Sequence, residues 1–362
     1  MTQTGPGNRV KIAIAGGGII GLSIGRKLAQ SGFQVSIFDQ SVVGGEASWA
    51  GAGMLAPGGE VDEPSAVSAL AIESRRMYGD FVRELEEASE LPIDYQECGA
   101  LEVAYSEDEL CALEQRAERQ ERLGIHSKRI TPGHVMTFWP RIRREGLAGG
   151  RFYPDDAIVN PRELTHALTL VCRKCSAAIY EHFRIEAIQV AEDEVILEDA
   201  CGTQRFDAVV VAAGAWSNQI GVGGVPALPA AEPVRGHLIG YQQPEQTCNT
   251  IVRHGPTYLL QRGNGLLIAG SSAERVGFDR ELNPFIEADL VSRAGFVMPH
   301  LEETAPSESW IGFRPASEEL RLGSWHSPRL YLAYGHFRNG ILLAPITAER
   351  IAAEISANSE ML

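Results

Sequence analysis

The sequence predicts an α/β lobe with a parallel sheet, joined to an α+β lobe with a mixed or antiparallel sheet. Three observations predict this class. A strand, a glycine-rich turn, a helix and a second strand occupy Lys11 to Asp39. Short, mainly apolar runs typical of buried parallel strands recur at Phe206 to Ala213 and near 330–334. Strand-like stretches of the antiparallel type lie between them, so we expect the first lobe to be discontinuous in sequence.

Length and composition narrow the class of protein. The chain has 362 residues, enough for two lobes, with 44% hydrophobic and 22% charged residues, which is ordinary for a globular protein. No apolar run approaches the roughly 18 residues of a membrane helix. A formal net charge of -15 disfavours nucleic acid and anionic membrane surfaces as partners.

The cysteines predict neither disulfides nor a metal site. Only Cys172 and Cys175 form a C-x-x-C, inside the helical-looking run Arg162 to Ala178, and no second pair completes a zinc site. The first ten residues lack the hydrophobic stretch of a signal peptide. We therefore expect ordinary thiols, no bound metal and a cytoplasmic protein.

The first βαβ unit carries the pattern of a Rossmann-like dinucleotide site. Val10 to Ala15 is an apolar strand, and Gly16, Gly18 and Gly21 open the helix that follows it. The glycines permit a tight turn, close approach of a pyrophosphate and close packing of helix on strand. Asp39 ends the second strand, Gln34 to Phe38, where its carboxylate would accept hydrogen bonds from ribose hydroxyls and repel a 2′-phosphate.

Two later segments indicate FAD as the cofactor. The second strand runs into a stretch of small residues, Gly44 to Gly59, which lets backbone amides crowd against an extended ligand. The loop Gly335 to Gly340 precedes a helix, whose positive end would stabilise negative charge on a reduced flavin.

The remaining elements follow from periodicity and turn residues. We expect helices at Ser65 to Leu91, Glu107 to Leu123 and Pro284 to Val297, and a terminal helix that ends at about Ser356. Strands are expected at Asp94 to Tyr105, Ala177 to Asp199, Arg235 to Gln242, Thr257 to Gln261, Gly265 to Ser271, Glu308 to Arg314 and Leu330 to Ala333. Arg151 to Asn160 is expected to be irregular, and Gly221 to Pro233 is expected to cross between the lobes. This order predicts a cofactor lobe from residues 1–90, 150–222 and 313–362, and a substrate lobe from 91–149 and 223–312.

Four segments carry a resemblance to a known family. They are Ile14 to Gly21, Gly51 to Pro57, Trp310 to Pro315 and Gly335 to Thr347, and with them the chain resembles the D-amino-acid oxidase superfamily of FAD-dependent oxidoreductases. Within that superfamily it is similar to the glycine oxidases of thiamine biosynthesis. The resemblance implies an FAD-binding lobe of glutathione-reductase type, an antiparallel-sheet substrate lobe and a homo-oligomer, dimeric or tetrameric.

The resemblance also implies site residues. Arg314 matches the arginine that binds the substrate carboxylate, and Tyr258 matches the tyrosine whose hydroxyl binds the same carboxylate. Arg338 matches an arginine at the edge of the flavin, and Met54 matches a residue that lies over the flavin. We expect Arg314, Tyr258 and Arg338 to be catalytic, and these three with Met54 to bind substrate. Expected FAD contacts are Gly16, Gly18, Ile19, Ile20, Gly21, Asp39, Gln40, Ala47, Ser48, Ala50, Gly51, Ala52, Gly53, Met54, Ile185, Ala213, Gly214, Trp216, Arg314, His336, Arg338, Asn339, Gly340 and Ile341.

The implied reaction is oxidative deamination of a small amine or amino acid with molecular oxygen. The amine becomes an imine, which water converts to a 2-oxo acid (glyoxylate from glycine) and ammonia, while oxygen becomes hydrogen peroxide. Two departures from the family leave the preferred amine open: Ala316 to Gly323 replaces a proline-containing segment, and Pro256 stands where a histidine is common. A D-amino-acid dehydrogenase with another electron acceptor and a sarcosine-oxidase-like enzyme remain alternatives. The latter usually tethers its flavin to a late cysteine, and no cysteine follows Cys248.

Overall fold

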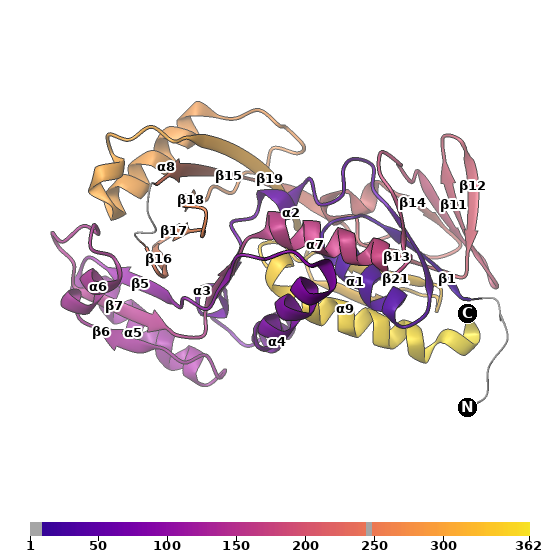
Figure 1. Ribbon diagram of the computed structural model, residues 1–362, viewed down its shortest axis with the longest axis horizontal. Coiled ribbons are helices and arrows are strands. Elements are labelled where there is room, and N and C mark those ends of the chain that lie inside the picture. The colour runs from indigo at the N-terminus through magenta and orange to yellow at the C-terminus, as the bar shows by residue number, and fades with distance from the viewer. Residues whose placement is uncertain (1–8, 244–247) are drawn as a thin grey trace.

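The computed structural model describes residues 9–243 and 248–362, which form two lobes side by side along the long axis of the molecule (Figure 1). The first lobe is built on a six-stranded sheet in the order β20-β21-β13-β1-β2-β9. Its strands are β1 (Lys11–Ala15), β2 (Gln34–Phe38), β9 (Ala178–Tyr180), β13 (Ala208–Val211), β20 (Arg321–Ser324) and β21 (Leu330–Tyr334). All neighbours are parallel except the edge pair β20 and β21.

The two faces of this sheet are covered by different layers. Ile12 and Ile14 of β1 belong to the core shared with the helices, whereas Ala13 and Ala15 belong to a separate core on the other face. This alternation is the period of two that a strand buried on both faces requires. The helices are α1 (Ile19–Gln30), α4 (Ala66–Ser89), α7 (Pro161–Lys174) and α9 (Gly340–Ala357), and the opposite layer is a four-stranded sheet of β10 (Ala187–Val190), β11 (Val195–Asp199), β12 (Gly202–Phe206) and β14 (Gly221–Gly223).

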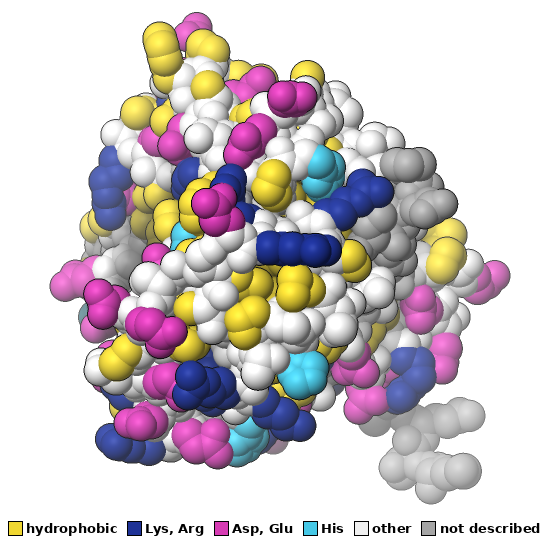
Figure 2. All heavy atoms as spheres, turned by 90° about the vertical axis from the view of Figure 1, so that its left-hand side faces the viewer, with side chains coloured by type: hydrophobic (Ala, Val, Ile, Leu, Met, Phe, Trp, Pro, Cys, Tyr) yellow, Lys and Arg dark blue, Asp and Glu magenta, His cyan; other side chains and the backbone are white. Residues whose placement is uncertain are grey.

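The second lobe holds an eight-stranded mixed sheet in the order β19-β15-β18-β17-β16-β5-β7-β6. Its strands are β5 (Ala100–Ala104), β6 (Lys128–Ile130), β7 (Gly149–Tyr153), β15 (Glu232–Gln242), β16 (Ile251–His254), β17 (Thr257–Gln261), β18 (Leu266–Gly270) and β19 (Glu308–Ala316). Helices α5 (Glu107–Glu121), α6 (Pro132–Phe138) and α8 (Pro284–Val297) belong to the same lobe. On the end of this lobe seen in Figure 2, acidic and basic side chains are interspersed.

Short elements connect the lobes. They are α2 (Ala47–Ala50), α3 (Pro57–Glu60) and a three-stranded sheet of β3 (Met54–Leu55), β4 (Tyr95–Gln96) and β8 (Ala157–Val159). Most of them come from the small-residue stretch after β2. The path of this stretch brings Met54 and Glu60 to the boundary between the lobes, where the pocket lies.

Two expectations about local structure are wrong. Arg151 to Asn160 is not irregular, because it contributes to β7 and β8. The two glycines at the start of β7 are unusual in a strand, so the sequence does not indicate one there. They are needed because a Cβ at Gly150 would lie 2.2 Å from the carbonyl oxygen of Glu102 on the neighbouring strand. Asp94 to Tyr105 is not one strand, because Gly99, with φ of 67°, separates β4 from β5, and these belong to different sheets.

Candidate active site

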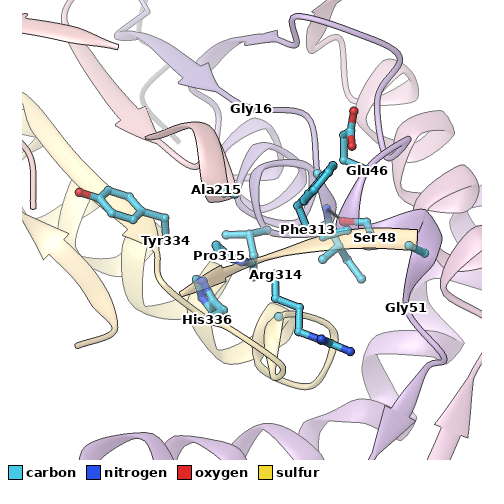
Figure 3. Close-up of a pocket in the computed structure, with 18 of the residues that line it drawn as sticks. Gly16, Glu46, Ser48, Gly51, Ala215, Phe313, Arg314, Pro315, Tyr334 and His336 are labelled. Carbon is cyan, nitrogen blue, oxygen red and sulfur yellow. Dashed lines mark hydrogen bonds between the residues drawn. The ribbon is translucent and has the colours of Figure 1, made fainter. Parts of the chain in front are cut away.

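A large pocket runs between the lobes, from the glycine turn after β1 to Arg314 on β19 (Figure 3). It brings together nearly all of the expected site residues. The residues that line it include Gly16, Gly18, Ile19, Ile20, Asp39, Gln40, Ala47, Ser48, Ala50, Gly51, Ala52, Gly53, Met54, Ile185, Ala213, Gly214, Trp216, Tyr258, Arg314, His336, Arg338, Asn339, Gly340 and Ile341. Gly21 lies behind this lining, where a Cβ would be 1.9 Å from the carbonyl oxygen of Gly16. Gly21 therefore serves close packing of the turn and helix.

One end of the pocket has the features of a dinucleotide-phosphate site. Gly16 has φ of 111°, and Gly18 precedes the first turn of α1 without a side-chain cap of its own. The hydroxyl of Ser48 accepts a hydrogen bond from the Ile19 amide at 2.9 Å, so α2 is joined to the start of α1. The positive end of α1 faces the pocket, and glycine at position 18 leaves room there for a phosphate.

Asp39 occupies the adjoining position at the end of β2. Its two carboxylate oxygens accept hydrogen bonds from the amides of Gly17 and Ser41, each at 2.8 Å. Burial raises the pKa of Asp39, and the two backbone hydrogen bonds oppose that rise. The carboxylate lines the pocket one strand away from the glycine turn, which fits the ribose beside a bound pyrophosphate.

The middle of the pocket is lined by backbone instead of bulky side chains. A Cβ at Gly51 would lie 2.5 Å from the Ile341 side chain, and one at Gly312 would lie 2.5 Å from Ala50. The segment after α2 is therefore packed between β19 and the start of α9. This close approach explains why small residues occupy these positions of the pocket lining.

The other end of the pocket contains a largely buried guanidinium, that of Arg314. Phe313 and Arg314 are neighbours on β19 and point to opposite sides of the strand (Figure 3). Arg314 donates from Nη1 to the carbonyl oxygen of Ser272 and from Nη2 to Oγ of Ser271, each at 2.8 Å. Among the residues that the structure describes, no carboxylate forms an ion pair with it. Burial lowers the pKa of Arg314.

Tyr258 on β17 lies beside this arginine. Its side chain is buried and hydrogen-bonds to Ser271, which also accepts from Arg314. Burial raises the pKa of Tyr258, so the phenol is neutral and can donate. Two glycines make room for the pair: a Cβ at Gly236 would lie 2.4 Å from both terminal nitrogens of Arg314, and one at Gly270 would lie 2.5 Å from the Tyr258 hydroxyl.

Two charged side chains close the site from the loop before α9 and from α3. Nη2 of Arg338 lies 3.0 Å from Oε1 of Glu60. Burial raises the pKa of Glu60, and the charges of Arg338, Arg253 and Arg314 oppose that rise. The sequence analysis missed Glu60, because its partner lies far along the chain and no local motif marks it. It also missed Ser271 and Gly236, which line the same end of the pocket.

His336 belongs to the loop before α9 and lines the pocket. Its ring is buried, and Nε2 lies 3.0 Å from Oγ1 of Thr347 on α9. Burial lowers the pKa of His336 to about 4, so the ring is neutral at neutral pH.

The fold and the pocket define a two-lobed flavoprotein, with a βαβ dinucleotide site in one lobe and an anion-binding arginine in the other. The chain belongs to the FAD dependent oxidoreductase family, which matches residues 11–354. It is an enzyme of that family, and FAD is its cofactor. The pocket fits this cofactor, because small residues, a helix start and Asp39 follow one another along its length.

Comparisons with individual proteins give nearer relatives. The chain is 32% identical to a glycine oxidase of Geobacillus kaustophilus over 350 residues, covering 95% of this chain and 92% of that protein. The crystal structure of glycine oxidase from that species superposes with a TM-score of 0.89 at 30% identity, covering 97% of this chain and 95% of the other. The chain is 33% identical to a bifunctional protein ThiO/ThiG of Synechocystis sp., with 94% of this chain matching 51% of that one. Among the described residues, no helix is long and apolar enough to cross a membrane.

Proposed function

We propose that this enzyme oxidises glycine or another small amine or amino acid to an imine. Water then converts the imine to a 2-oxo acid, which is glyoxylate when glycine is the substrate, and ammonia, while molecular oxygen becomes hydrogen peroxide. The observation that carries the proposal is Arg314, a largely buried guanidinium at the end of a cofactor pocket without an ion-pair partner among the described residues. A guanidinium that lines a pocket in this way is stabilised by a ligand of opposite sign, and a carboxylate fits its planar fork.

The residues around Arg314 suit a small amino acid. Arg314 and the Tyr258 hydroxyl can share one carboxylate, since both surround Ser271. Arg338 lies close enough to Arg314 for their charges to interact, and Met54 lines the same pocket. Both side chains would limit the space beyond the carboxylate. Bound FAD supplies a two-electron acceptor for the hydrogen on the substrate α-carbon. The contribution of the protein is to fix the substrate by its carboxylate, so that this hydrogen faces the cofactor.

The relatives support both the substrate and a role for the product. Glycine oxidases match the chain along almost its whole length, which supports glycine as a substrate. The match to about half of the bifunctional ThiO/ThiG protein supports a link to thiazole synthesis, in which the product of one activity supplies the next. We further propose a cytoplasmic homo-oligomer, dimeric or tetrameric. For the lobes we propose residues 1–90, 150–222 and 313–362 as the cofactor part, and 91–149 and 223–312 as the substrate part.

A substrate panel with direct detection of peroxide tests the proposal. Purified holoenzyme is mixed with glycine, sarcosine and small D-amino acids, and peroxide and ammonia are measured. We expect equal amounts of both from glycine or another small amino acid. Reduction of an artificial dye without peroxide would instead favour a dehydrogenase that uses another electron acceptor.

An arginine variant tests the carboxylate site separately. Arg314→Ala should raise KM by about 100-fold or more, since a charge-assisted bidentate contact is lost, while FAD remains bound. Arg275→Ala serves as the control, because Arg275 is exposed and pairs with Glu232 outside the pocket. An unchanged KM in Arg314→Ala would refute the assignment of the carboxylate site.

A further inference from the structure

Arg262 is a buried arginine that the proposed reaction does not use. It follows β17, the strand that carries Tyr258, and its side chain is only 2% exposed. Among the residues that the structure describes, no carboxylate lies within ion-pair distance of it. Burial and the neighbouring charge of Arg162 lower the pKa of Arg262 to about 10, so it remains a cation at neutral pH. An unpaired buried cation is costly, so its contacts need an explanation.

The contacts of Arg262 are two consecutive backbone carbonyls. Its Nη2 donates to the carbonyl oxygen of Gly51 at 3.0 Å and to that of Ala52 at 3.4 Å. On one side of these residues, the indole of Trp310 donates to the carbonyl oxygen of Ala50 at 2.8 Å, and on the other the Val159 amide donates to that of Gly53 at 2.9 Å. Side chains and backbone of neighbouring elements therefore hold four carbonyls in succession.

The geometry of the peptide bond determines where the partner N–H groups point. In a trans peptide the N–H is directed opposite to the C=O. The carbonyls of Gly51 and Ala52 point toward Arg262, so the amides of Ala52 and Gly53 point away from it. Both residues line the pocket, and within residues 9–243 and 248–362 neither amide has a hydrogen-bond acceptor. Two buried donors thus remain for a ligand.

The position of these amides identifies the part of the cofactor that they meet. Met54 follows them directly and also lines the pocket. Just before them, Gly51 packs against Ile341 near Arg338, and Ala50 packs against Gly312 near Arg314. The glycine turn and Asp39, which fit the ADP part, lie earlier in the chain, before α2. The isoalloxazine is the redox-active part, and it gains negative charge when it is reduced.

We propose that Arg262 is a positioning residue that directs the amides of Ala52 and Gly53 at the hydrogen-bond-accepting edge of the isoalloxazine and so stabilises reduced, anionic FAD. The guanidinium polarises both peptides, which strengthens their N–H groups as donors, and it places a positive charge behind them. This role depends on FAD binding, and it does not depend on which amine is oxidised.

The test measures the cofactor without substrate turnover. Sulfite forms an anionic adduct with oxidised flavin, so its affinity reports how strongly the protein stabilises negative charge on the ring. We expect Arg262→Met to bind FAD and to weaken sulfite binding by about tenfold or more. The same tenfold loss in stabilisation of the reduced form would lower the two-electron midpoint potential by about 30 mV.

Arg329→Met is the matched control. Arg329 is also buried and donates to the backbone carbonyls of Glu192, Asp207 and Met361, but these lie away from the pocket. The sulfite affinity and the two-electron midpoint potential of Arg329→Met should equal those of the native protein. Native values in Arg262→Met with FAD fully bound would overturn the proposal.

Arg262→Lys keeps the test decisive if the methionine variant does not fold. Lysine retains the charge but replaces the planar guanidinium that spans two carbonyls. We expect the sulfite affinity of Arg262→Lys to lie between that of the native protein and that of Arg262→Met. A loss of about threefold relative to the native protein would support the proposal. Affinity equal to that of the native protein would contradict it, because the contact with both carbonyls would then be unnecessary.

Discussion

Arg338 and Glu60 form an ion pair at the substrate end of the pocket, with Nη2 of Arg338 3.0 Å from Oε1 of Glu60. Arg338 comes from the loop before α9 and Glu60 from α3, so the pair connects two segments that lie far apart in the sequence. The Glu60 carboxylate is buried and also lies within the fields of Arg314 and Arg253. The pair therefore sets the net charge that a substrate carboxylate meets.

Glu60→Gln should increase the affinity of the holoenzyme for acetate. The substitution removes a negative charge and leaves Arg338 and Arg314 without that compensation, so we expect a lower Kd for acetate by about tenfold. Titration followed by the absorbance of the bound flavin gives the Kd. Glu73→Gln is the control, because Glu73 pairs with exposed Arg350.

The same carboxylate predicts a dependence on pH. Burial raises the pKa of Glu60 above its ordinary value of 4.5, so protonation begins at a higher pH than for an exposed glutamate. After correction for the ionisation of acetate itself, native affinity should rise as pH falls through this pKa. The Glu60→Gln variant should lack this rise, and a rise of equal size in both proteins would assign it to another group.

Gly236→Ala should damage the carboxylate site without loss of FAD. A Cβ at this position would lie 2.4 Å from Nη1 and Nη2 of Arg314, so the guanidinium must leave its place between Ser271 and Ser272. We expect KM to rise by about tenfold or more with a smaller change in kcat. Gly133→Ala in the same lobe meets only Thr131 Oγ1 at 3.9 Å and should behave as the native protein. Equal KM values in the two variants would mean that the position of Arg314 is unimportant.

Asp39→Asn should weaken FAD binding and leave the substrate site intact. The carboxylate accepts one amide on each oxygen, and an asparagine would turn an NH2 group toward either Gly17 or Ser41. We expect the Kd of FAD to rise by about ten- to 100-fold. Measurement uses fluorescence of released FAD on dilution. Asp207→Asn is the control, because Asp207 accepts the Lys11 amide at the opposite end of the same sheet, so its retention of FAD should be native.

The sequence predicts the parts of the fold that depend on local pattern. The βαβ unit, the helix after Ser65 and the strand before Arg314 are all formed, because periodicity and capping residues specify them within a few positions. Strand β7 could not be predicted, because its glycines are required by a close contact with the neighbouring strand. No local sequence pattern reveals such a contact. Strands β16 and β20 are four residues each and were also not predicted.

The residues of the candidate site also fall into those that the sequence predicts and those that it does not. Residues within motifs, such as Gly16 and Arg314, could be chosen from the sequence because a turn or a matching segment surrounds them. Glu60 and Arg262 could not, because each gains its role from a contact with a segment far away in the sequence. Glu60 meets Arg338, and Arg262 meets the carbonyl of Gly51, 211 residues away. Sequence separation of this size leaves no local signal.

His336 predicts a loss of stability in mild acid. Burial lowers the pKa of His336 from 6.5 to about 4 in the folded protein, whereas the unfolded chain keeps the ordinary value. Between these pH values the unfolded chain binds more protons, so stability should fall as pH decreases from 6.5 toward 4. The full contribution of this one group is about 3 kcal/mol.

His336→Gln removes the titrating ring and can keep a hydrogen bond to Thr347, so its unfolding free energy should change less over this pH interval than that of the native protein. Urea unfolding at a series of pH values, followed by tryptophan fluorescence and by release of FAD, measures the difference. His166→Gln is the control, because His166 lies exposed on α7 and should leave the native pH dependence unchanged. If His336→Gln and the native protein lose stability equally, the pKa of His336 does not differ between the folded and the unfolded protein, and the acid sensitivity belongs to other groups such as the paired carboxylates.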